Sequence, residues 1–470
     1  MATVPVRIRK RKPKNAKGRL LSDFSDLSNA ERALIESCRV GSDCGFGDHK
    51  CPKRRDPQVC IRAGILRLLI IGGDIECPVH DRGINLEGAY IEGELDLRDT
   101  KLGFPVRILN CFLPDGVNLR RAKTTILGFS GCYTSKFLAA AIDCSADLYF
   151  DQGFVCQTAV ELIGASIGGD VYFDGSYFRS KSKMKDPEGY SINLSGASIG
   201  GQLYFRGIKR MLGRLSLQRV QANTLCDDFE SWRGVQWVDL DGFTYDRIVE
   251  GPTDSATRID WLSRQDRDHL GREFKPQPWE QLIKVLREMG HDADARAVAI
   301  AKQEAMREAK KFTGIGWLLH GAYGYFAGYG YQPVKTVKAM FFVWFLGLTV
   351  FAVAEDLGIM APSSPIIHSK PKLLEACGQQ SDGRLTTWTE CRELPKEYTT
   401  FNPLIYSLDL ILPLVDLQQE KDWAPIVAVN GTEWTIGRAL VRAFLWFEIL
   451  FGWAMSLLLV AVLGNLVKKD

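Results

Sequence analysis

Histidine is scarce in this sequence, and the common catalytic signatures are missing. Only six of the 470 residues are histidine, and there is no Ser–His–Asp set, H-E-x-x-H segment, Walker loop or paired-carboxylate motif. General acid–base catalysis therefore has few residues to rest on. The formal net charge of +3 is too small an excess to indicate nucleic-acid binding by itself. The sequence does not indicate a reaction, and nucleic acid is not an expected partner.

Acidic residues are absent from the first 20 positions, which also lack the apolar stretch of a secretory signal. We therefore expect that the N-terminus is not exported, and we interpret residues 1–26 as a basic, disordered, solvated tail. A tail that contacts nucleic acid or anionic lipid is the alternative. The segment carries eight basic side chains: Arg7, Arg9, Lys10, Arg11, Lys12, Lys14, Lys17 and Arg19.

Two long apolar runs stand out near the C-terminal end. Residues 337–354 read VKAMFFVWFLGLTVFAVA, and residues 440–467 read LVRAFLWFEILFGWAMSLLLVAVLGNLV. A helix of about 20 residues spans a bilayer. The first run reaches that length when Lys335 and Lys338 at its start extend to the interface, and the second is long enough with room to tilt. Two buried helices of a soluble core are the alternative, but runs so rich in aromatic residues favour membrane insertion. The sequence predicts a two-span domain at 334–470, with the lipid bilayer as a partner.

Loop charges predict the orientation of these spans. The intervening residues 355–437 carry six Lys or Arg against twelve Asp or Glu, whereas basic residues precede the first span and Lys468 and Lys469 end the chain. By the positive-inside rule, both termini should be cytoplasmic and the loop external. Cys377 and Cys391 fall in this loop, where an oxidising compartment would let them close a disulfide. The other ten cysteines lie in the predicted cytoplasmic part.

Short alternating segments recur between residues 74 and 250, as ELDL at 94–97, DLYF at 147–150, DVYF at 170–173 and QLYF at 202–205. Side chains two apart share one face of a strand, so Val171 and Phe173 should point together and Tyr172 away from them. Glycine pairs in the repeated phrase SIGG let the backbone turn. One such unit cannot bury its apolar face alone, so we predict stacked coils of about 20 residues, interrupted by a Lys/Ser-rich insertion at 179–190.

A phosphate-binding loop is the competing interpretation of SIGG. A dinucleotide fingerprint needs G-x-G-x-x-G between a strand and a helix, whereas strand-like residues follow these glycines. On either side of the repeats the patterns are helical, beginning with a capping box at Ser28 and Glu31. The expected fold is a mainly β solenoid (a right-handed β-helix) at 74–250, with an N-terminal helical cap at 27–73, a helical connector at 251–333 and the two-helix transmembrane domain.

A cluster of thiols near the N-terminus is a candidate metal site. Four cysteines and one histidine within 23 residues could surround a zinc ion tetrahedrally. Their spacings do not match the usual C-x₂₋₄-C knuckle, so ordinary reduced thiols are the alternative. No other cofactor is indicated. The candidate ligands are Cys38, Cys44, Cys51, Cys60 and His49.

Acidic residues near the predicted spans are candidates for a polar pathway. The segment 401–417 has apolar residues at helical spacing but is too short to span. It could be a re-entrant pore helix with Asp409 or Asp416 facing a cation path. An amphipathic helix that lies on the outer surface and stabilises a dimer is the alternative. Glu448 lies inside the second apolar run, where an ionisable residue is a functional candidate unless it sits at the interface near Arg442.

Six segments together resemble a bacterial family labelled membrane-associated oxidoreductase, over roughly residues 27–470. They read IRAGILRLLIIGG, NLEGAYIEGELDL, GASIGGDVYF, QLIKVLREMGHDADARAVAIAKQ, GYGYQP and FNPLIYSLDLILPLVDL. The repeats are also similar to pentapeptide-repeat proteins, although Leu95 breaks the five-residue period. The resemblance implies the bacterial inner membrane and, by its label, redox chemistry. It brings no catalytic motif that can be placed on residues of this chain.

Taken with the residue patterns, the expected function is a membrane-tethered scaffold or sensor. Solenoids offer long binding surfaces, and two-span proteins usually pack against copies or partners, so a protein partner or a second copy is expected. An oxidoreductase and an ion-channel-like protein with a re-entrant segment are the alternatives.

Overall fold

The computed structural model describes residues 20–179, 189–309, 311–364, 388–426 and 436–467, together with single positions between 365 and 387. The chain divides into two compact units, Met1–Lys311 and Phe312–Asp470. Most of the predicted basic tail, most of the predicted insertion at 179–190 and the terminal Lys468 and Lys469 lie outside the described residues.

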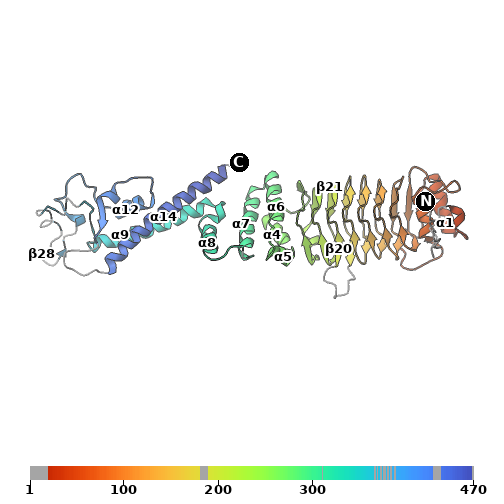
Figure 1. Ribbon diagram of the computed structural model, residues 1–470, viewed down its shortest axis with the longest axis horizontal. Helices are drawn as coiled ribbons and strands as arrows, with labels where there is room; N and C mark the ends of the chain where they lie inside the picture. Colours follow the sequence, from red (N-terminus) through yellow and green to blue (C-terminus); the bar gives the residue numbers. More distant parts are fainter. Residues whose placement is uncertain are drawn as a thin grey trace, which may run out of the picture. The chain divides into compact units, whose positions relative to one another are not determined.

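The first unit contains a β-solenoid of about seven turns, built from parallel strands in three sheets (Figure 1). One sheet consists of β2 (Cys60–Arg62), β4 (Tyr90–Glu92), β7 (Phe112–Leu113), β11 (Tyr133–Thr134), β15 (Val155–Cys156), β19 (Tyr177–Arg179) and β22 (Arg210–Leu212). Another consists of β5 (Leu95–Asp96), β8 (Val117–Asn118), β12 (Phe137–Leu138), β16 (Val160–Glu161), β20 (Tyr190–Asn193), β23 (Arg214–Ser216) and β25 (Trp237–Asp239).

The largest sheet turns a corner of the solenoid and covers two faces. Its first face holds β1 (Cys44–Gly45), β3 (Ile84–Glu87), β6 (Val106–Leu109), β10 (Leu127–Gly128), β14 (Leu148–Tyr149), β18 (Val171–Tyr172), β21 (Ser198–Phe205), β24 (Gln221–Asp227) and β26 (Arg247–Val249). Its second face holds β9 (Lys123–Thr124), β13 (Asp143–Cys144) and β17 (Ser166–Ile167). The long β21 joins the faces, because Ile199 pairs with β17 and Leu203 pairs with β18.

Strand register gives the length of a coil. Equivalent positions on the first face are 21 to 23 residues apart, except for the 32 residues between Val171 and Leu203. The coils are therefore close to the predicted length, and the one long coil is where the insertion was predicted. The positions that define this register are Ile84, Val106, Leu127, Leu148, Val171, Leu203, Leu225 and Ile248.

Alternation along each strand builds the core. Val171 and Phe173 are both fully buried, which confirms that they share the inner face. Tyr172 points the other way and stacks between Tyr149 and Tyr204, with ring centroids 4.7 and 4.4 Å apart. Each coil thus contributes apolar side chains to a continuous interior, and three consecutive coils contribute tyrosines to an outer stack.

Close contacts between coils explain the repeated SIGG phrase. A Cβ added at Gly200 would lie 2.5 Å from the carbonyl oxygen of Gly168 in the preceding coil. Beside these glycines, the Asp170 N–H donates to Asp147 Oδ1 at 2.9 Å, and the Gln202 N–H donates to Asp170 Oδ1 at 2.7 Å. Strands β18 and β21, not helices, lie at these glycines. The repeat is structural, and the phosphate-loop interpretation is wrong.

Helices close both ends of the solenoid (Figure 1). At the N-terminal end lie η1 (Leu21–Asp23), α1 (Asn29–Val40) and α2 (Ala63–Ile70), and at the other end lie α3 (Phe229–Arg233), α4 (Ser255–Ser263), α5 (Arg267–Leu270), α6 (Gln277–Glu288) and α7 (Asp292–Glu308). The capping box is present, because Ser28 Oγ accepts from the Glu31 N–H at 3.1 Å and Glu31 Oε2 accepts from the Ser28 N–H at 2.9 Å. The parallel ladders begin at β1 and β2, inside the predicted cap at 27–73.

The second unit contains two helices long and apolar enough to cross a membrane, Pro333–Asp356 and Ile436–Gly464. Only 22% of the apolar window of each helix is buried, whereas the core helix of a soluble protein is mostly buried. The second unit begins at Phe312, so the connector predicted at 251–333 is divided between the two units. The described helices of the second unit are α8 (Ile315–Ala327), η2 (Gly328–Gly330), α9 (Pro333–Asp356), η3 (Trp388–Glu390), α12 (Pro403–Ile411), α13 (Gln419–Asp422) and α14 (Ile436–Val467).

The segment between α9 and α14 folds onto the helices. Strands β27 (Met360–Pro362) and β30 (Trp423–Pro425) pair antiparallel, as do β28 (Gln380–Ser381) and β29 (Arg384–Leu385). A buried cluster includes Phe351 of α9, Tyr406 of α12 and Trp423 of β30. The short helix α12 packs against both long helices.

Candidate functional site

The predicted metal ligands near the N-terminus do not meet in one place. Cys38 lies on α1 and Cys44 on β1, and both are buried. Burial raises the pKa of the Cys38 thiol to about 12 and that of the Cys44 thiol to about 11, whereas a metal-bound cysteine is a thiolate. Among the described residues, no group of three or more His, Cys, Asp or Glu is placed to hold a metal ion.

Two other members of this predicted set have separate partners. The Cys51 thiol donates to the Cys111 carbonyl oxygen at 3.4 Å. His49 Nδ1 lies 2.8 Å from Glu87 Oε2 on an exposed part of the surface. These contacts connect the segment before β2 to later coils, so the residues stabilise the start of the solenoid.

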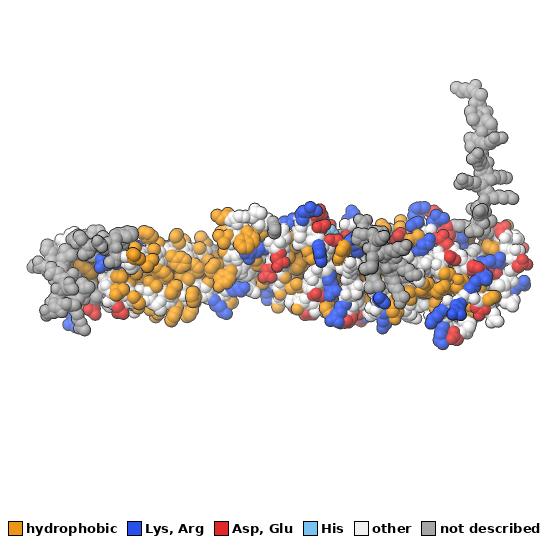
Figure 2. Space-filling model, turned by 90° about the horizontal axis from the view of Figure 1, so that it is seen from below, with side chains coloured by type: hydrophobic (Ala, Val, Ile, Leu, Met, Phe, Trp, Pro, Cys, Tyr) orange, Lys and Arg blue, Asp and Glu red, His pale blue; other side chains and the backbone are white. Residues whose placement is uncertain are grey.

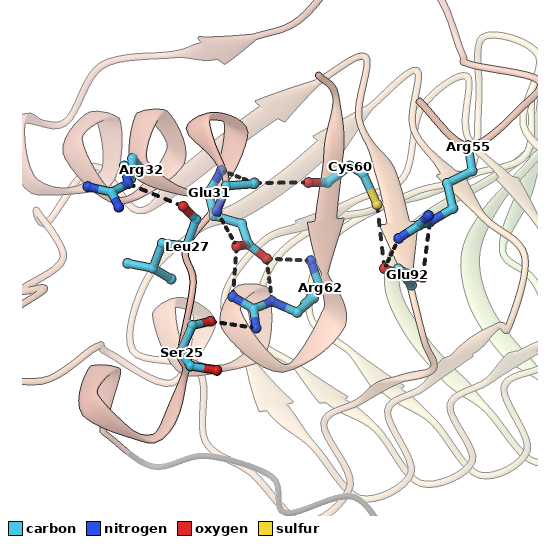
Figure 3. Close-up of polar contacts among 9 residues, drawn as sticks. Ser25, Leu27, Glu31, Arg32, Arg55, Cys60, Arg62 and Glu92 are labelled. Carbon is cyan, nitrogen blue, oxygen red and sulfur yellow. Dashed lines mark hydrogen bonds and ion pairs between the residues drawn. The ribbon is translucent and has the colours of Figure 1, made fainter. Parts of the chain in front are cut away.

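The fifth predicted ligand, Cys60, lies beside the ion pair between Glu31 and Arg62 that fixes α1 to β2 (Figure 3). The Cys60 thiol donates to Glu92 Oε2 at 3.7 Å, and Arg55 pairs with the same carboxylate. On the other side of the strand, the Glu31 carboxylate accepts from Arg62 Nε at 2.7 Å and from Arg62 Nη2 at 2.9 Å. Two backbone N–H groups also donate to it. Burial alone would raise the pKa of Glu31, but the hydrogen bonds from Arg62 and the backbone lower it.

This lowered pKa predicts an acid-sensitive cap. Ionised Glu31 contributes stability that is fully present above its unfolded pKa, near 4.5, and is lost as the pH falls through the lower folded value. We expect the melting temperature of the full chain in detergent to fall below that pH, and the Glu31→Gln variant to be less stable at neutral pH but to lose less on acidification. Equal acid sensitivity of the two proteins would show that Glu31 is not responsible.

The cysteines between the long helices are joined. A disulfide connects Cys377 and Cys391, with Cα atoms 5.5 Å apart. Cys377 is buried, and Cys391 packs against the cluster that contains Trp388. The bond therefore links two parts of the segment that folds onto the ends of α9 and α14.

The two aspartates predicted to face a cation path make local contacts. Asp409 is buried, and its carboxylate accepts from the Leu417 N–H at 2.7 Å and from the Glu420 N–H at 2.9 Å. It therefore fixes the turn between α12 and α13. Asp416 is exposed and forms an ion pair with Lys421. The structure does not bring these two aspartates together with Glu448.

Helix α12 reaches the middle of the two long helices. The Trp344 indole N–H, near the midpoint of α9, donates to the Leu404 carbonyl oxygen at 3.1 Å. A Cβ added at Gly452, near the midpoint of α14, would lie 2.5 Å from the Ile411 carbonyl oxygen. Leu414, just beyond α12, is 81% exposed. This placement is that of a short helix held against the centre of the helical pair.

Glu448 is the centre of a buried polar site at this contact. Its side chain is 0% exposed, and its Oε1 lies 2.5 Å from Ser407 Oγ of α12. Ser407 Oγ also lies 3.0 Å from the Trp344 carbonyl oxygen of α9. A Cβ at Gly347 would lie within 2.8 Å of both carboxyl oxygens, so the bare backbone of α9 covers the carboxyl group.

The arrangement joins a carboxyl, a hydroxyl and a carbonyl oxygen from three helices. A carboxyl group in such a place can bind and release a proton, and an ionisable residue inside an apolar span is a candidate functional residue. Sequence reasoning identified Glu448 but missed Ser407 and Gly347. A serine within an apolar helix and a glycine within an apolar run were the available signals.

A second place that the sequence did not reveal is a cavity of about 170 Å³ near the end of the solenoid. The Arg214 guanidinium lies 3.6 Å from the centroid of the Trp237 ring, and Asp239 lies 3.7 Å from His269 across the same lining. These residues could contact a small polar ligand. Nothing in their spacing distinguishes them from other positions of the repeats.

Family models, curated proteins and solved structures contain no match to this chain. The assignment of a function therefore rests on the residues and contacts described above.

Proposed function

We propose that this chain is a membrane-tethered scaffold, in which α9 and α14 cross a bilayer and the β-solenoid presents a rigid surface to a protein partner or a second copy. The observation that carries the proposal is the exposed apolar surface of the two helices (Figure 2). Soluble proteins rarely expose contiguous apolar patches of such extent. The exposed side chains include Phe341, Phe342, Phe345, Leu346 and Val353 of α9 and Leu440, Trp446, Phe447, Leu450, Trp453, Leu457 and Val460 of α14.

We place the chain in the bacterial inner membrane because of the family resemblance of its sequence, and the cysteines support a topology with both termini cytoplasmic. The segment between the spans holds a disulfide, which persists in an oxidising compartment. The first unit holds ten free cysteines, which is typical of a reducing compartment. Together with the loop charges, this distribution favours an external loop and a cytoplasmic solenoid.

The outer tyrosine stack is the surface that we assign to partner binding. Tyr149, Tyr172 and Tyr204 form a row along consecutive coils. The hydroxyl groups of the first two donate to Asp147 and Asp170 at 3.0 and 2.9 Å. Tyrosine is enriched at protein interfaces because it combines apolar area with a polar end. A row held this rigidly costs little conformational entropy when a partner binds.

Charges placed in the middle of α9 test the tether. We expect Phe342→Asp with Leu346→Asp to release the protein from membranes washed with alkali, because each aspartate costs about 2.5–3.5 kcal/mol at the centre of a span. Both side chains are exposed, so the change does not disturb a core. The matched control is Ile75→Asp in the first unit, a 99% exposed position that should leave membrane retention unchanged. Wild-type protein that alkali extracts would overturn the proposal.

An ion-conducting pathway is the second candidate, and the position of α12 beside the middle of α9 favours it. Ion flux through purified protein in planar bilayers would support this candidate over a scaffold. The redox chemistry that the family label implies requires an electron carrier, so an oxidoreductase should carry a coloured cofactor. A flat absorbance spectrum above the protein band would argue against it.

A further inference from the structure

The Glu448 carboxyl is buried without a basic partner in the part of the chain that the structure describes. Its Oε1 contacts Ser407, and its Oε2 is buried with no hydrogen-bond partner. Burying an isolated carboxylate costs far more free energy than burying a neutral carboxyl group. The surroundings therefore favour the neutral form.

The hydrogen bonds of Ser407 lead to the same conclusion by counting protons. The hydroxyl has one proton but lies within hydrogen-bond distance of two oxygens, the Trp344 carbonyl and Glu448 Oε1. A neutral Glu448 donates to Ser407 while Ser407 donates to Trp344, so both contacts become hydrogen bonds. If Glu448 is ionised, the Ser407 hydroxyl donates its only proton in a hydrogen bond to the carboxylate. Ser407 Oγ and the Trp344 carbonyl oxygen are then two acceptors with no proton between them.

Among the described residues, none forms an ion pair with Glu448. On α12, Asp409 is occupied by two backbone N–H groups, and the Tyr406 hydroxyl donates to the Trp423 carbonyl oxygen. On α14, Arg442 lies six residues earlier in the chain and makes no described ion pair with Glu448. The α9 backbone at Gly347 closes the remaining side.

We propose that Glu448 is a proton-binding site, occupied at neutral pH, and that its proton holds α12 against α9 and α14. When the proton leaves to hydroxide or water, the carboxylate requires hydration, and α12 must move away from Gly347 to admit it. The site couples proton release to separation of the three helices. This inference goes beyond the scaffold function, which does not require α12 to move.

Infrared spectroscopy of the full chain in detergent tests occupancy. We expect a carboxylic-acid C=O band at neutral pH that is absent from Glu448→Gln and retained in Glu397→Gln, a matched control at an exposed position. Ser407→Ala should shift the frequency of the band, which keeps the test decisive if Glu448→Gln fails to fold. A wild-type spectrum whose carboxylic-acid region is unchanged by both Glu448→Gln and Ser407→Ala would overturn the proposal.

Hydrogen exchange of the α12 peptide, read by mass spectrometry, tests the coupling. At mildly acidic pH, the α12 peptide should exchange at the same rate in wild type and in Glu448→Gln. At alkaline pH, it should exchange at least about tenfold faster in wild type than in Glu448→Gln. Equal exchange at every pH would show that the proton does not control α12. Membrane retention of each variant is measured in parallel, so a failed tether is distinguished from a failed proton site.

Discussion

Replacing Asp227 by alanine is expected to lower the free energy of unfolding by about 3–5 kcal/mol, because the change leaves a buried guanidinium without its charge partner. Asp227 is 0% and Arg258 1% exposed, and they form a bidentate pair with distances of 2.7 and 2.8 Å. The Trp232 indole N–H donates to the same carboxylate at 2.8 Å. The pair attaches α4 to the last coils of the solenoid.

The measurement is denaturant unfolding of the full chain in detergent, followed by the β-sheet signal. Asp99→Ala is the control, because Asp99 and its partner Arg121 are both more than half exposed and exposed pairs contribute little. A double variant, Asp227→Leu with Arg258→Met, should recover most of the loss, since an apolar pair avoids the unpaired charge. Equal stability of Asp227→Ala and Asp99→Ala would contradict the assignment.

Alanine at the corner glycines should have the second large effect on stability. The Cβ of Gly168→Ala would lie 2.3 Å from the Ser145 carbonyl oxygen, and that of Gly200→Ala would lie 2.5 Å from the Gly168 carbonyl oxygen. Both contacts involve backbone atoms, so neighbouring coils have to separate. We expect a loss of about 1–3 kcal/mol for each substitution, which is typical of overpacking.

The control for these glycines is Gly103→Ala, because no heavy atom lies within 4 Å of a Cβ built there. We expect this variant to unfold at the wild-type denaturant concentration. Similar losses at Gly103 and Gly200 would indicate that helix or strand propensity, and not crowding between coils, sets the cost.

The solenoid could be predicted because each coil repeats its own local pattern. The alternation in DVYF specifies an inner Val171 and Phe173 and an outer Tyr172, whichever coil lies beside it. The start of the ladders was missed, since β1 consists of only Cys44 and Gly45 and carries no alternation. The long apolar helices were predictable from composition, because every residue in the run contributes to the same signal.

The candidate site was less accessible to sequence reasoning. Glu448 is conspicuous as a charged residue in an apolar run, but its partners on α9 and α12 are set by tertiary packing. Asp409 could not be assigned as the residue that fixes the turn before α13, because that role depends on where two backbone N–H groups point. The spacing of the N-terminal cysteines likewise gave no information on which later coil each would contact.

The in-register parallel strands described above have a consequence for how this architecture can vary. A strand in the middle of a ladder bonds only to its equivalents in the two adjacent coils, so removing or duplicating one whole coil leaves every remaining ladder matched. The reach of the solenoid can therefore change in steps of about 4.8 Å, the spacing of neighbouring strands. Mutations that delete or duplicate inner coils would change the length of the solenoid in discrete steps. The helices at either end would still contact the same terminal coils.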